Sequence, residues 1–138
     1  MSRHQGISSS GRPYTVIIAE GSKFQAKQLQ QIFESEEYKI VGFAETGKEL
    51  IELYNKNKTV NLITMELNLP VMDGYATFWE IKSMGMIPKI LFITEETTPA
   101  VMKSLLDNGA MDFLGKPIKR EKVLEKAKQI IDKVQTIR

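Results

Sequence analysis

Short apolar runs alternate with longer amphipathic stretches along most of this chain. The runs are rich in β-branched and aromatic residues, and turn residues bound them, as is typical of buried strands. They lie at residues 14–19, 38–44, 60–65, 89–93 and 111–114. A loop with Pro70 and Gly74 follows the third run. This run is expected to be a central strand of a parallel sheet.

The stretches between these runs carry apolar residues at helical spacing, which predicts five helices. Their expected bounds are residues 23–35, 46–57, 75–84, 98–108 and 119–134. Ser22 and the sequence Thr46-Gly47-Lys48-Glu49 are helix-starting signals, Pro99 suits a first turn, and Gly85 and Asn108-Gly109 suit helix ends. The expected inner faces comprise Phe24, Leu29, Ile32, Phe33, Leu50, Leu53, Tyr54, Phe78, Ile81, Val123, Leu124, Ala127, Ile130, Ile131 and Val134. Trp79 is expected to be partly exposed.

Strict alternation of strands and helices with short loops predicts a doubly wound (βα)5 fold. Right-handed crossovers then give an α/β domain with a five-stranded parallel sheet, in the flavodoxin-like arrangement. We expect this domain to span residues 13–138. Residues 1–12 have no apolar core and are expected to form a flexible tail, in which His4 has no partner.

Composition excludes several classes of function. The chain has 138 residues and 42% apolar residues, enough for one domain with a real core. It contains no cysteine, so disulfides and thiolate metal sites are excluded. A net charge of +2 does not favour a nucleic-acid partner, and no apolar run approaches the length of a membrane span or a signal core. A cytoplasmic protein without a membrane partner is therefore expected.

Polar residues follow the predicted strands where each strand ends. They are Glu20 with Gly21, Glu45, Glu66, Thr94 and Lys116. In a doubly wound sheet, the carboxyl ends of the first, third, fourth and fifth strands converge on one crevice. Each residue alone has an ordinary structural explanation, such as a helix-start carboxylate or a solvated lysine. Together, two carboxylates, a hydroxyl and an ammonium at matching strand ends predict a functional site.

These residues resemble a known family. The acidic turn at Glu20, the sequence LITMELNLPVMDG at 62–74, Thr94, and NGAMDFLGKP at 108–117 are similar in order and spacing to the receiver domain of response regulators, of the single-domain chemotaxis type. The resemblance covers residues 14–134. It implies a role in two-component or phosphorelay signalling, with Phe113 at the aromatic switch position and a cis Lys116-Pro117 bond.

Three positions depart from that family. The phosphate acceptor of the family is an aspartate, but this chain has Glu66 at that position. The family has two acids in its first turn, and Gly21 replaces the second of them. Glu95 stands where the family usually has a small residue. In the family, that second acid, the acceptor and the backbone carbonyl at the position of Asn68 hold Mg²⁺. We therefore expect weak or absent Mg²⁺ binding, no conventional phosphorylation, and neither catalytic residues nor a metal site.

Three functions remain open from the sequence. One is a docking module without enzymatic activity, which binds signalling proteins through its fourth helix, fifth strand and fifth helix. The second is a weakly phosphorylated, Mg²⁺-dependent receiver. The third is a flavodoxin-like cofactor-binding protein, because the architecture alone does not fix function. The longer side chain of Glu66 leaves two alternatives open. Glu66 either mimics the phosphorylated state or forms a pair with Lys116 that holds the crevice closed.

Overall fold

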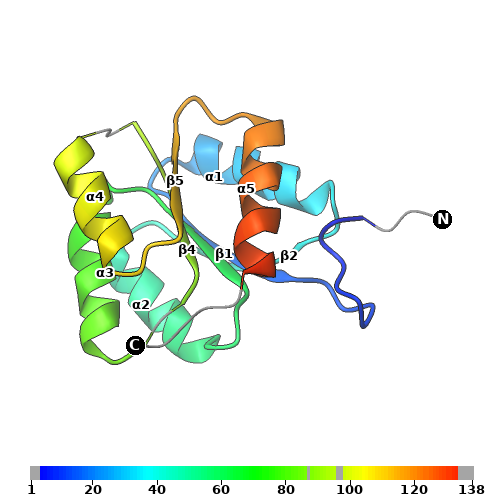
Figure 1. The fold of residues 1–138 in the computed structure, drawn as a ribbon, viewed down its shortest axis with the longest axis horizontal. Helices are drawn as coiled ribbons and strands as arrows, with labels where there is room; N and C mark the ends of the chain where they lie inside the picture. The colour runs from blue at the N-terminus through cyan, green and yellow to red at the C-terminus, as the bar shows by residue number, and fades with distance from the viewer. Residues whose placement is uncertain (1–3, 87, 96–97, 134–138) are drawn as a thin grey trace.

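Five parallel strands form a single twisted sheet in the computed structural model, which describes residues 4–86, 88–95 and 98–133 (Figure 1). The strand order is β2-β1-β3-β4-β5, and each neighbouring pair is parallel. The strands are β1 (Thr15–Ala19), β2 (Lys39–Ala44), β3 (Leu62–Met65), β4 (Ile90–Thr94) and β5 (Asp112–Gly115). The doubly wound (βα)5 prediction is confirmed.

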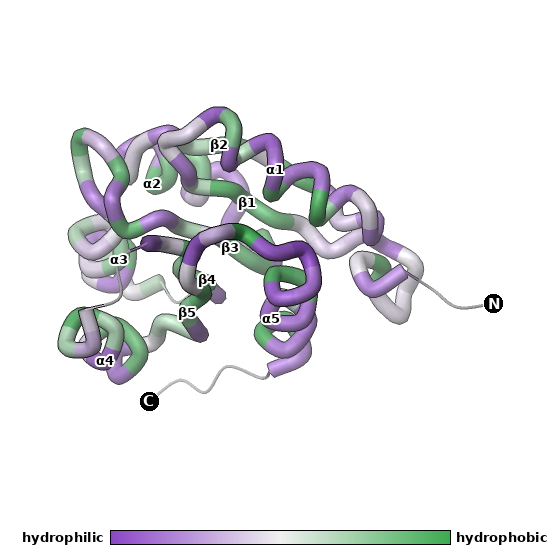
Figure 2. The backbone as a smooth tube through the Cα atoms, turned by 90° about the horizontal axis from the view of Figure 1, so that it is seen from above, coloured by the Kyte–Doolittle hydropathy of each residue, from purple (hydrophilic) through white to green (hydrophobic). Residues whose placement is uncertain are grey.

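Helices cover both faces of the sheet. One face is covered by α1 (Lys23–Glu34) and α5 (Arg120–Asp132), and the other by α2 (Gly47–Lys56), α3 (Gly74–Ser83) and α4 (Pro99–Asp107). Figure 2 shows these layers with the sheet seen between them. The predicted helices and strands are all present, with ends displaced by one or two residues. No helix in the described ranges is long and apolar enough to cross a membrane.

Side chains alternate between two cores on either side of the sheet. Val16 and Ile18 of β1 join α1 and α5, whereas Ile17 and Ala19 face α2, α3 and α4. The same alternation holds in β3, because Leu62 lies in the first core and Ile63 in the second. Successive side chains of a strand point to opposite faces, so positions 20 and 66 are directed toward the α1 and α5 side.

The predicted inner face of α1 was wrong at one position. Phe24 is 79% exposed, whereas Ala26, Leu29, Ile32 and Phe33 are buried. The helix begins at Lys23, so Phe24 lies in its first turn, off the apolar stripe of positions 26, 29 and 33. The other inner faces are buried or partly buried as predicted, Trp79 is partly buried, and Val134 lies outside the described residues.

The described part of the N-terminal segment, for which a flexible tail is predicted, makes hydrogen bonds to the rest of the domain. Gln5 Nε2 donates to Tyr38 Oη at 2.8 Å and to the Leu124 carbonyl at 2.9 Å. Gly6 N donates to the Glu36 carbonyl at 2.8 Å, and a Cβ at Gly6 would lie 2.2 Å from that oxygen. Only glycine fits this close approach. Hydrogen bonds of the backbone cannot be predicted from the hydrophobicity of the sequence, so this contact was not expected.

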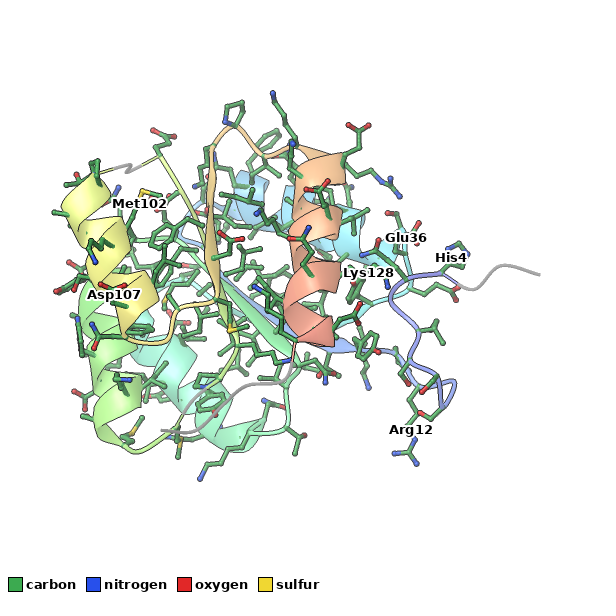
Figure 3. The ribbon with its side chains drawn as sticks, in the orientation of Figure 1. His4, Arg12, Glu36, Met102, Asp107 and Lys128 are labelled. Carbon is green, nitrogen blue, oxygen red and sulfur yellow. The ribbon has the colours of Figure 1, made fainter. Side chains whose placement is uncertain are left out.

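His4 also has partners, contrary to the prediction. Its ring nitrogens lie 3.7 Å from Glu36 Oε1 and 3.3 Å from Glu37 Oε2, at the turn between α1 and β2 (Figure 3). These contacts are exposed, and each contributes little to stability. The segment is therefore anchored mainly by the bonds of Gln5 and Gly6.

Thr64 of β3 is expected to stabilise the protein when it is replaced by valine. Among the described residues, its buried Oγ1 has no hydrogen-bond partner, and its strand neighbours are Ile18 and Leu91. Removing an unpaired buried hydroxyl at nearly constant shape should raise the free energy of unfolding by about 1 kcal/mol. Urea unfolding of Thr64→Val measures this change.

Thr77→Val is the matched control for that substitution. Thr77 is equally buried, but its Oγ1 donates to the Asp73 carbonyl at 2.6 Å. Loss of this bond should lower the free energy of unfolding by about 1 kcal/mol. If both variants are destabilised alike, the Thr64 hydroxyl has a partner in solution.

Candidate functional site

A buried lysine joins two buried glutamates at the carboxyl edge of the sheet. Glu20 and Glu66 directly follow the adjacent strands β1 and β3, and Lys116 follows β5. Lys116 Nζ lies 2.6 Å from Glu20 Oε1 and 2.7 Å from Glu66 Oε1. The side chains of Lys116, Glu20 and Glu66 are only 5%, 5% and 8% exposed. The predicted convergence of these strand ends is therefore confirmed.

The remaining carboxylate oxygens accept hydrogen bonds from the backbone. Ser22 N donates to Glu20 Oε2 at 3.0 Å, and Asn68 N donates to Glu66 Oε2 at 3.2 Å. The Thr94 hydroxyl also bonds to Glu66. Every oxygen of the two carboxylates thus has a protein partner, which is what a buried charge requires.

These hydrogen bonds set the protonation states of Glu66 and Lys116. Burial acts to raise the pKa of Glu66, but bonds from Lys116, Thr94 and the Asn68 N–H outweigh it, so the pKa lies below the ordinary value of 4.5. Burial acts to lower the pKa of Lys116, but bonding and charge from Glu20 and Glu66 outweigh it, so that pKa lies above 10.5. Glu66 and Lys116 are therefore both charged at neutral pH.

The other predicted site residues belong to the exposed turns that follow the strands, and we call these turns the mouth of the crevice. Gly21 is exposed, and a Cβ there would lie 3.3 Å from Pro70 Cδ and 3.7 Å from the Glu45 carbonyl. Asn68 and Glu95 are exposed as well. Glu45 Oε1 lies 3.9 Å from Lys23 Nζ, and both side chains are exposed. The mouth thus has no carboxylate at position 21.

Among the described residues, the crevice offers a metal ion the two buried carboxylates of Glu20 and Glu66. Mg²⁺ requires a near-octahedral set of oxygen ligands. In the described ranges, no group of three or more histidine, aspartate or glutamate side chains lies together so as to hold a metal ion. The two carboxylates that are present already share the Lys116 ammonium.

An aromatic row extends from the surface of α3 to the predicted switch position on β5. Tyr75 and Trp79 have ring centroids 6.2 Å apart, and Trp79 contacts Phe78 edge to face at 5.6 Å. Phe78 lies 6.1 Å from Phe92, which stacks on Phe113 at 5.0 Å with an interplanar angle of 18°. Phe113 is thus packed inward against the core of α2, α3 and α4.

The Lys116-Pro117 peptide bond is cis, as predicted. Two predictions for Lys116 are therefore confirmed: the cis bond to Pro117 and the position of its side chain in the crevice. No structural observation bears on whether Phe113 moves, and its switch role stays a prediction.

Sequence reasoning missed one member of the site. Lys116 Nζ also donates to Gln25 Oε1 on α1. Ser22 and Gln25 have the spacing of a capping box, which favours a glutamine side chain folded back toward its own helix start. The signal in the sequence is the position of Gln25 in the first turn of α1, the helix that begins three residues after Glu20.

Comparisons with known proteins agree with this geometry. The family model described as the response regulator receiver domain matches residues 16–128. The chain is 32% identical over 127 residues to the chemotaxis protein CheY of Treponema pallidum, covering 91% of this chain and 88% of that protein.

Solved structures give the same result. A chain in the crystal structure of the CheX-CheY-BeF3-Mg²⁺ complex from Borrelia burgdorferi matches with a TM-score of 0.91 and 30% identity, covering 96% of this chain and 100% of that one. The response regulator domain of Thermotoga maritima CheB matches with a TM-score of 0.81 and 27% identity, covering 90% and 100%. The family match leaves no support for a flavodoxin-like cofactor protein.

Proposed function

The chain belongs to the response regulator receiver family of two-component signalling, and from this premise we propose that it is an atypical receiver. In this proposal it works as a protein-docking module, without conventional aspartate phosphorylation and without catalysis of its own. The observation that carries the proposal is the ion-pair arrangement of Lys116 between Glu20 and Glu66.

A phosphoryl group on the residue at position 66 would need compensating positive charge. Phosphoryl transfer depends mainly on positioning and on neutralisation of charge, often by Mg²⁺. Here the ammonium of Lys116 is already neutralised by two buried carboxylates. The direct pair supports a closed crevice for Glu66, rather than mimicry of the phosphorylated state.

The reacting atom is also displaced. Glutamate is longer than aspartate by one methylene, a displacement of about 1.5 Å. A misplacement of about 1 Å can cost on the order of 100-fold in rate. The exposed Glu95 adds a negative charge near the mouth, which repels an incoming anion.

We further propose that signalling partners bind the face formed by α4, β5 and α5. The strand β5 is an edge of the sheet, and Leu106 of α4 is an exposed apolar side chain. With the chain as bait, Leu106→Asp should abolish capture of a specific partner. Met84→Asp, at an exposed apolar position at the end of α3, is the matched control.

Mg²⁺ binding is expected to be weak, and beryllofluoride should not strengthen it. The crevice offers two carboxylates that Lys116 already occupies, and Gly21 supplies no ligand. Isothermal calorimetry should therefore detect no binding at millimolar Mg²⁺. The Borrelia burgdorferi CheY is the positive control, because its complex contains Mg²⁺ and BeF3. Millimolar or tighter binding that beryllofluoride enhances would contradict the proposal.

A weakly phosphorylated receiver is the second candidate. Thr94 and Lys116 both contact Glu66, and these are the residues that the family retains beside its acceptor. Incubation with acetyl phosphate and Mg²⁺, followed by intact-mass spectrometry, separates the candidates. A phosphoryl adduct on the wild-type chain supports the second candidate, and its absence supports the first.

A further inference from the structure

The first turn of α1 directs a glutamine toward the crevice. Ser22 caps the helix, and its Oγ accepts a hydrogen bond from Gln25 N at 3.2 Å. This bond fixes the backbone of Gln25 in the first turn of the helix, which begins shortly after Glu20. Its side-chain oxygen accepts a hydrogen bond from Lys116 Nζ, across 91 residues of sequence.

Gln25 completes the set of acceptors around the lysine. An ammonium group has three N–H donors and no acceptor. The oxygens around Lys116 Nζ are Glu20 Oε1, Glu66 Oε1 and Gln25 Oε1. Because the lysine side chain is buried, each donor needs a protein partner. With all three acceptors in place, no N–H of Lys116 is left for an incoming anion.

We propose that Gln25 is a positioning residue that holds the Lys116 ammonium in the closed crevice and so keeps it from binding a phosphate-like anion. The proposal rests on the proposed function, in which the crevice is closed and not phosphorylated. It deepens that function by naming the residue that completes the closure.

Gln25 is the one acceptor of the three that can be removed without leaving an unpaired charge. Glu20 and Glu66 are buried carboxylates, and loss of either would change the charge of the crevice. Gln25 is neutral and only partly buried. Its replacement by an apolar side chain of similar length therefore frees one N–H donor and keeps both carboxylates.

The test uses the full chain with Gln25→Met, and Gln28→Met as the matched control. Gln28 lies one turn further along α1 and is also partly buried. Side-chain ¹⁵N NMR of the Lys116 ammonium reports its hydrogen exchange directly. We expect exchange to be about tenfold faster in Gln25→Met, from the loss of one charge-assisted hydrogen bond, and unchanged in Gln28→Met.

Inorganic phosphate is the probe for the freed donor. Gln25→Met should bind it about tenfold more tightly than wild type, read from amide shifts of Glu66, Thr94 and Lys116. Gln25→Leu also removes the acceptor without adding charge, so it should give the same faster ammonium exchange and provides the test if the methionine variant folds poorly. Ammonium exchange within twofold of wild type in a folded Gln25→Met protein would overturn the proposal.

These readouts separate the inference from the function on which it rests. If wild type acquires a phosphoryl adduct from acetyl phosphate, the proposed function fails, whatever the exchange rates show. If wild type acquires no adduct and Gln25→Met leaves the ammonium protected, the role of Gln25 fails and the proposed function stands.

Discussion

Phosphorylation by acetyl phosphate and Mg²⁺ is expected in the double variant Gly21→Asp with Glu66→Asp, at a rate on the order of 100-fold above either single variant. Glu66→Asp alone moves the acceptor but adds no carboxylate at position 21. Gly21→Asp alone adds the carboxylate but leaves the acceptor misplaced. Both residues would serve one ion, so their effects should not be additive.

The structure has room for this repair. A Cβ at Gly21 meets Pro70 Cδ at 3.3 Å, so the proline ring must move by only a few tenths of an ångström. Shortening residue 66 draws its carboxylate away from Lys116, which reopens the crevice for a phosphoryl group. Adding Glu95→Ala should increase the rate further, because it removes a negative charge at the mouth.

Intact-mass spectrometry of each variant over a time course measures the phosphoryl adduct. The Glu66→Ala variant with Gly21→Asp is the control, because it contains the new carboxylate without an acceptor. If Glu66→Asp alone is phosphorylated as fast as the double variant, the missing carboxylate at Gly21 is not the cause of inactivity.

The second large effect is expected from Lys116→Met, which removes the positive charge between Glu20 and Glu66. Breaking a buried ion pair on one side leaves uncompensated charge, which typically costs about 3–5 kcal/mol of stability. We therefore expect a large drop in the free energy of unfolding at pH 7, measured with urea. Lys122→Met, on the exposed side of α5, is the control and should change stability little.

The pH dependence of the two proteins should have opposite sign. In wild type the pKa of Glu66 lies below 4.5, so its stabilisation is full above that pH and is lost as the pH falls through the folded-state pKa. In Lys116→Met, both the bond and the charge of the lysine are gone, while the bonds from Thr94 and the Asn68 N–H remain. Burial is the largest single influence on Glu66, so we expect it to outweigh these two bonds and to raise the folded-state pKa above its ordinary value. The variant should then gain stability between pH 7 and 5.

A wild-type and a variant stability curve that run parallel between pH 7 and 5 would contradict this account. Parallel curves would mean that Lys116 does not set the protonation of Glu66. The loss of stability would then come from packing alone.

The crevice could be predicted from the sequence because strand ends are easy to locate. Glu20, Glu66, Thr94 and Lys116 each follow an apolar run, and a parallel sheet brings the carboxyl ends of neighbouring strands together. The pairing of Glu66 with Lys116 and Thr94 followed from the reach of the longer side chain. These arguments need only strand order and side-chain length.

Other features depend on contacts that residue type does not specify. Gln25 has the spacing of a helix cap, but its side chain bonds to a residue 91 positions away. Gln5 and Gly6 look like part of a polar tail, yet they donate to the Tyr38 hydroxyl and to the carbonyls of Leu124 in α5 and of Glu36. The hydrophobicity of Phe24 predicts a core position, but its place in the first turn of α1 keeps it off the buried stripe.

The aromatic row from α3 to β5 gives the protein an optical reporter of its own. Trp79 is the single tryptophan of the chain, and its edge-to-face contact with Phe78 leads through Phe92 to Phe113. An outward rotation of Phe113 would remove the stacked partner of Phe92 and loosen the packing beneath the indole. Tryptophan emission and its quenching by acrylamide can therefore test the predicted switch role of Phe113 in unlabelled protein, in real time and at micromolar concentration.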